Sequence, residues 1–152
     1  MSVAARLTEL GIELPAVAAP VAAYVPAVVH ADLVYTSGQL PFTDGALPAT
    51  GKVGAGVAAE DAKLYARTCA LNALAAAADA AGGVDRIAGV LRVGGFVASE
   101  ASFTGQPGVI NGASEVLGEI FGDAGRHARA AVGVPVLPLD SPVEVEVTFI
   151  LA

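Results

Sequence analysis

Arg129 is the residue whose type and position most strongly suggest ligand chemistry. It lies in the largely apolar stretch 127–138, and a strand-like segment follows at 141–147. The chain has only eight Lys and Arg residues, so one placed among hydrophobic residues adds little to solubility. A guanidinium is a planar fork of N–H donors that suits a carboxylate. Arg129 is therefore a candidate carboxylate anchor; the structural alternative is an ion pair with Glu144, Glu146 or another acid.

Glu144 and Ser37 are candidates for chemistry beside such an anchor. A functional Glu144 would act as a base or orient a water molecule. Glu144 and Glu146 share one face of an alternating strand, so both could instead be solvated. Ser37 ends a strand at a glycine turn, where its hydroxyl could contact a ligand or satisfy the turn backbone. No G-x-S-x-G elbow is present in the sequence, which disfavours a serine hydrolase.

Other polar residues give weaker signals. Tyr24 lies among prolines and could line a pocket or pack as an ordinary aromatic residue. Asn111 lies near the start of an expected helix, where capping is the commoner role. His30, His127 and the single Cys69 have no metal-ligand spacing, so no metal site is expected. The glycines match neither a phosphate loop nor a dinucleotide fingerprint, so no cofactor is expected either.

The composition limits the classes of partner. A net charge of -7 argues against nucleic acid and against anionic membranes. Only 15% of the residues are charged, below the roughly 25% that is typical of soluble domains, which favours self-association. Proline, glycine and charged residues interrupt every apolar run, so no membrane span is expected. With its polar N-terminus and lone cysteine, the chain is expected to be cytoplasmic.

The pattern of hydrophobic residues predicts the elements that must position these side chains. Helices are expected over 2–10, 59–81 and 109–121, and strands over 33–37, 86–98 and 143–151. Prolines rule out a long element in 12–30, and 42–58 is a glycine-rich loop. Gly94 and Gly95 predict a bulge or a close approach. The order strand, helix, strand, helix, strand favours two helices on one face of a sheet, with another subunit covering the opposite face. The buried stripe expected in 59–81 comprises Leu64, Thr68, Leu71, Ala75 and Ala78.

An ordered set of residues from about 20 to 150 resembles the RidA/YjgF family, also described as endoribonuclease L-PSP-like. The resemblance implies an α+β, chorismate-mutase-like single domain over 1–152, with 1–20 as an N-terminal extension. Its sheet would be mixed, with two helices packed on one face. It also implies a homotrimer with ligand sites between subunits. The matching residues are Tyr24, Thr36-Ser37-Gly38-Gln39-Leu40-Pro41, Asn111, Ala128-Arg129, Leu137-Pro138 and Val143-Glu144-Val145-Glu146.

The resemblance also implies a function. Better-characterised members are enamine/imine deaminases that hydrolyse 2-imino acids to 2-ketoacids and ammonia. By position, Arg129 would anchor the substrate carboxylate, Glu144 would position water, and Ser37 with Gly38 would line the pocket. Tyr24 and Asn111 would complete it. The alternative is a non-catalytic trimer that binds or senses a small carboxylate or ketoacid.

The chain departs from the common pattern of the family in ways that mark a divergent subgroup. Ala131 stands where a cysteine is frequent, and the segments 50–58 and 103–112 are unusual.

Overall fold

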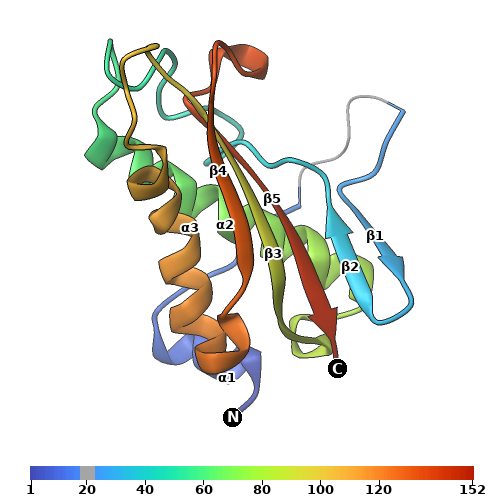
Figure 1. Ribbon diagram of the computed structural model, residues 1–152. Helices are drawn as coiled ribbons and strands as arrows, with labels where there is room; N and C mark the ends of the chain where they lie inside the picture. The colour runs from blue at the N-terminus through green and yellow to red at the C-terminus, as the bar shows by residue number, and fades with distance from the viewer. Residues whose placement is uncertain (18–22) are drawn as a thin grey trace.

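The structure is a computed structural model that describes residues 1–17 and 23–152. Its centre is a five-stranded sheet in the order β1-β2-β5-β3-β4 (Figure 1). Only β3 and β4 run parallel; every other neighbouring pair is antiparallel. The sheet is thus mixed, as expected. The strands are β1 Ala27–His30, β2 Leu33–Thr36, β3 Ile87–Ala98, β4 Ala128–Val134 and β5 Val143–Leu151.

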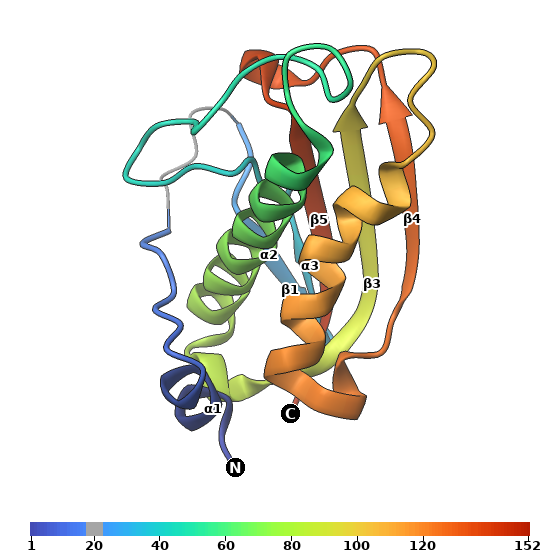
Figure 2. The same ribbon diagram turned by 90° about the vertical axis from the view of Figure 1, so that its left-hand side faces the viewer.

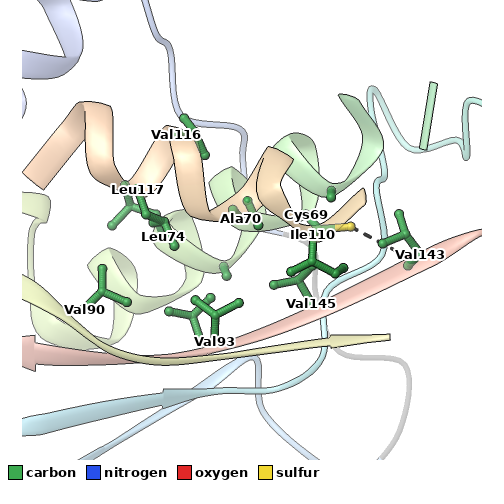
Figure 3. Packing of buried hydrophobic residues seen from close by; sticks show 14 of the residues in the cluster. Cys69, Ala70, Leu74, Val90, Val93, Ile110, Val116, Leu117, Val143 and Val145 are labelled. Carbon is green, nitrogen blue, oxygen red and sulfur yellow. Dashed lines mark hydrogen bonds between the residues drawn. The ribbon is translucent and has the colours of Figure 1, made fainter. Parts of the chain in front are cut away.

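Two long helices, α2 Ala59–Ala81 and α3 Gln106–Phe121, cover one face of this sheet (Figure 2). The odd-numbered residues of β5 from Val143 to Phe149 point into that layer and are buried, while Glu144 and Glu146 lie on the opposite, uncovered face. Figure 3 shows Leu74, Ile110 and Leu117 packed between the helices and the sheet. The expected arrangement of two helices on one face is confirmed.

The short helix α1, Val3–Glu9, begins and ends where the sequence indicates. The Ser2 hydroxyl accepts a hydrogen bond from the Ala5 amide, and Gly11 has a positive φ of 67° just beyond the helix. None of the helices in residues 1–17 and 23–152 combines the length and the apolar character that a membrane span requires.

The two long helices correct the sequence-based expectations in detail. The bounds of α2 are confirmed, but its expected stripe is only partly right: Ala75 and Ala78 are buried, whereas Leu64 is 62% exposed. The buried stripe is built instead from small residues, because α3 and the sheet approach this helix closely. Helix α3 begins at Gln106, three residues earlier than expected, since Gly105 is its N-cap. The buried stripe of α2 includes Ala62, Ala66, Cys69, Ala70, Ala73 and Ala77.

Two strands, β1 and β4, were not among the predicted elements. The segment Ala128–Val134 is rich in alanine and glycine and shows no alternation, yet it pairs in parallel with β3 over seven residues.

The close approach expected at Gly94 and Gly95 is confirmed. A Cβ atom at Gly95 would lie 2.5 Å from Ile110, and one at Gly94 would lie 2.8 Å from Glu146. The register shifts of β3 occur earlier, between residues 87 and 92.

Candidate functional site

Strand β4 forms an edge of the sheet and carries Arg129. The residue pairs with Val93 of β3, and Val93 is fully buried beneath the helices. Directly paired strand residues share a face, so the Arg129 side chain lies on the helix side of the sheet. Its Nη1 donates to Ser114 Oγ at 3.1 Å and its Nη2 donates to the Pro107 carbonyl at 3.2 Å. The guanidinium therefore lies along α3.

Arg129 forms no salt bridge with any residue that the structure describes. The ion pair with Glu144 or Glu146, the structural alternative from the sequence, is absent because those carboxylates lie on the other face of the sheet. Glu146 instead pairs with Arg92, with 3.6 Å between Nη1 and Oε1. Of the five N–H donors of a guanidinium, two are used by Ser114 and Pro107. The other three remain available to a ligand or to water.

Ser114 and His127 extend this cluster, and sequence reasoning assigned neither of them to the site. His127 Nε2 lies 2.8 Å from Ser114 Oγ, and His127 Nδ1 lies 2.6 Å from the Gly125 carbonyl. In the sequence, Ser114 and His127 are thirteen residues apart and belong to no motif. The only signal in the sequence is the two-residue spacing of His127 and Arg129, because residues two apart in an extended segment point to the same side, and His127 directly precedes β4.

Asn111 belongs to the same side of α3. It lies four residues after Pro107 and three residues before Ser114, so helical spacing places it between the two groups that hold Arg129. The capping role considered for Asn111 is wrong, because the helix begins at Gln106 and its N-cap is Gly105. Helical spacing thus places Asn111 on the side of α3 along which Arg129 is held.

Glu144 occupies a different environment on the uncovered face of the sheet. A Cβ atom at Gly38 would lie 2.0 Å from Glu144 Oε1, so any larger residue at this position would force the carboxylate to move. Burial, and secondarily the neighbouring Glu146, raises the pKa of Glu144 above its ordinary value. A half-buried carboxylate with a raised pKa is a stronger base than an ordinary surface glutamate.

Ser37 and Tyr24 lie at the β2 end of this second group. The Ser37 hydroxyl donates to the Val25 carbonyl at 2.6 Å and its amide donates to the Pro26 carbonyl at 2.8 Å. Its observed role is therefore to tie the segment before β1 to the end of β2. Tyr24 is 54% exposed and is not packed in the core. Gln39 pairs with Val145, which holds Gly38 beside Glu144.

The expected site residues thus form two groups on opposite faces of one sheet. Arg129 and Asn111 lie at the edge between β4 and α3, whereas Ser37, Gly38 and Glu144 lie on the uncovered side.

Cys69 is fully buried, and its Sγ lies 3.9 Å from the Val143 carbonyl (Figure 3). Burial raises the pKa of this thiol. Across residues 1–17 and 23–152, no three His, Cys, Asp or Glu side chains are grouped to hold a metal ion.

Comparison with known proteins gives one consistent result. The family model described as "YjgF/chorismate_mutase-like, putative endoribonuclease" matches residues 4–150. Protein TCP17 of Trypanosoma cruzi is 44% identical over 145 residues, which cover 95% of this chain and 91% of the relative.

Two solved structures superpose over nearly the whole chain. Atu1372 of Agrobacterium tumefaciens, a protein of unknown function, has a TM-score of 0.90 and 41% identity, covering 99% of this chain and 92% of its own. A protein of Shewanella oneidensis, described as a "putative endoribonuclease", has a TM-score of 0.94 and 36% identity, with coverages of 99% and 100%.

Proposed function

The chain belongs to the YjgF/chorismate mutase-like family, and from that premise we propose that it binds a small 2-imino acid through Arg129 and hydrolyses it to a 2-ketoacid and ammonia. The observation that carries the proposal is the environment of Arg129. This partly buried guanidinium has only neutral partners among the described residues, Ser114 Oγ and the Pro107 carbonyl. A positive charge held in this way is suited to a carboxylate from outside the chain.

The proposed reaction requires few catalytic groups from the protein. An imine carbon is already electrophilic, so anchoring the substrate and positioning water supply most of the acceleration. Glu144 accepts a proton from the attacking water as the oxygen bonds to C2, and passes it to the imine nitrogen, which gives a carbinolamine. The hydroxyl proton of the carbinolamine is then transferred to the same nitrogen, the C2–N bond breaks, ammonia leaves, and the C2=O carbonyl of the ketoacid forms. The raised pKa of Glu144 supports this role because it brings the basicity of the carboxylate closer to neutral pH.

We propose that the site is completed between copies of the chain in a homotrimer. Arg129 and Glu144 lie on opposite faces of one sheet, so a single chain does not bring them to one ligand. The uncovered face also exposes Val28, Tyr35 and Val132, at 52%, 47% and 45%, which is apolar surface suited to an interface. The β4–α3 edge of one copy would then face Glu144 of the next.

RNA cleavage, the activity in the family description, has less support from this chain. Its net charge is -7, and phosphate-backbone binding depends on lysines and arginines that neutralise phosphates. A carboxylate ligand needs only the one arginine found at the β4–α3 edge.

The direct test measures ketoacid and ammonia release from enzymatically generated iminoalanine. We expect Arg129→Ala and Glu144→Gln each to lower the rate at least about 100-fold, the scale for losing a positioned catalytic group. Gly38→Ala should act like Glu144→Gln by displacing the carboxylate, whereas Gly118→Ala, which meets nothing within 4 Å, is the matched control. A wild-type protein that gives no acceleration would refute the deaminase; pyruvate binding that survives Glu144→Gln would then indicate a binding protein.

A complementation experiment tests the shared site. Arg129→Ala and Glu144→Gln chains are co-expressed with different tags, and the mixed oligomers are purified. Because each mixed interface can pair a native Arg129 with a native Glu144, activity should return to a substantial fraction of the wild-type value. Mixed oligomers as inactive as either parent would contradict a site built by two copies, and sedimentation of the wild type as a monomer would contradict the trimer.

A further inference from the structure

The polar chain that leads away from Arg129 has a defined direction. A carbonyl oxygen only accepts hydrogen bonds, so the 2.6 Å contact between His127 Nδ1 and the Gly125 carbonyl requires a proton on Nδ1. In the neutral imidazole Nε2 is then an acceptor. The Ser114 hydroxyl therefore donates to Nε2 across 2.8 Å.

This direction fixes what Ser114 offers to Arg129. With its only proton directed at His127, Oγ presents lone pairs to Nη1 of Arg129 at 3.1 Å. If the hydroxyl were free to rotate, its proton could point at the guanidinium and weaken the contact. The histidine thus sets the orientation of the hydroxyl, and the hydroxyl holds one arm of the guanidinium fork.

The second arm is held by a group with no rotational freedom, the Pro107 main-chain carbonyl at 3.2 Å. Together the two contacts restrain both terminal nitrogens of Arg129 along α3. A side chain restrained before a ligand arrives loses less conformational entropy on binding. The restraint therefore favours carboxylate binding.

We propose that Ser114 and His127 are positioning residues that orient Arg129 for its carboxylate ligand. This inference rests on the proposed function of Arg129 and adds two residues to it. Neither residue needs to touch the substrate: His127 acts through Ser114, and Ser114 acts through the guanidinium.

The first test is independent of any ligand. Nitrogen-15 NMR of the histidine side chains at about pH 8, well above the ordinary histidine pKa of about 6.5, distinguishes the two neutral tautomers. We expect His127 to show a proton on Nδ1 and a bare, hydrogen-bonded Nε2, and Ser114→Ala to shift the Nε2 signal. A His127 with its proton on Nε2 would overturn the inference.

The second test measures pyruvate affinity by calorimetry, with pyruvate as the carboxylate probe. Ser114→Ala should raise the Kd about tenfold, equivalent to about 1.4 kcal/mol, and Ser114→Thr, which keeps the hydroxyl, should restore most of the affinity. His127→Phe should weaken binding by a smaller factor. Ser102→Ala, which changes an exposed serine that makes no hydrogen bond to Arg129, Ser114 or His127, is the control and should bind as wild type.

The outcomes separate the two proposals. Arg129→Ala that binds pyruvate like the wild type would refute the anchor itself. Loss of binding in Arg129→Ala with unchanged affinity in Ser114→Ala and His127→Phe would refute the positioning residues and leave the anchor intact. Urea unfolding of each variant guards against a structural explanation, because the affinity of the positioning variants should fall while their unfolding midpoints stay close to that of the wild type.

Discussion

Replacement of Gly112 by alanine should destabilise the protein even though alanine is the better helix former. Gly112 lies on α3 where this helix crosses α2. A Cβ atom there would lie 1.9 Å from the Lys63 carbonyl oxygen and 2.8 Å from the carbon of the same group. The obstacle is main chain near the start of α2, so it cannot rotate away as a side chain could.

The size of the effect follows from these distances. Ordinary contact begins at 3.4 Å, so the helices would have to separate locally by about 3.4 − 1.9 = 1.5 Å. Overpacking a core typically costs 1–3 kcal/mol, and a rigid obstacle places this site at the upper end. The higher helix propensity of alanine stabilises the folded state by about 1 kcal/mol relative to glycine. The net loss is therefore about 2 kcal/mol, or roughly 4–8 °C in Tm for a chain of this length.

Gly118→Ala on the same helix is the matched control. A Cβ atom at Gly118 meets nothing within 4 Å, so the free energy of unfolding of this variant should exceed that of the wild type by a few tenths to about 1 kcal/mol. Both variants and the wild type are compared by urea denaturation at one protein concentration, because self-association would make stability concentration-dependent. The reasoning would be refuted if Gly112→Ala unfolded at or above the wild-type midpoint.

Three further outcomes follow from the site and the core. The raised pKa of Glu144 means that its ionised form is disfavoured in the folded state. Glu144→Gln should therefore be more stable than the wild type at pH values above the raised pKa, and this difference in stability should vanish below the ordinary glutamate pKa of about 4.3. Urea unfolding midpoints measured against pH check this expectation. Gly95→Ala should lower the free energy of unfolding by about 1–3 kcal/mol, because the new Cβ atom would lie 2.5 Å from the buried side chain of Ile110. Urea unfolding measures this loss. Arg129→Lys should bind pyruvate about tenfold more weakly, since an ammonium lacks the fork that reaches both acceptors on α3, and equal calorimetric affinities would contradict this.

Local patterns were sufficient for much of the fold. The acidic first turn and Gly82 define α2 at 59–81, and the alternation of Val143, Val145 and Val147 defines β5. Both signals depend on residues that are close in sequence, so they are readable without a structure. The strand β4 has no such signal, because alanine and glycine show little contrast between its two faces.

Alanine richness also explains the error in α2. Apolar side chains surround most of this helix, so periodicity alone gives weak contrast between its faces. Leu64 is 62% exposed while Ala66 and Ala70 are fully buried. Close packing against α3 at Gly112 selects small residues for the buried side of α2, and Gly112 is more than 40 residues away from Ala66 and Ala70 in the sequence.

The amino-acid pattern alone was enough to identify the side chains available for chemistry, the prominence of Arg129, and two of the framing elements, α3 and β5. The strand that carries Arg129 and the arrangement of the side chains depend on the three-dimensional fold. The parallel register that pairs Arg129 with Val93 turns the guanidinium toward α3, whereas the alternation of β5 turns Glu144 to the opposite face. Register and packing are set by contacts between distant segments, and for that reason no local pattern could show that Arg129 meets Ser114 and not a glutamate.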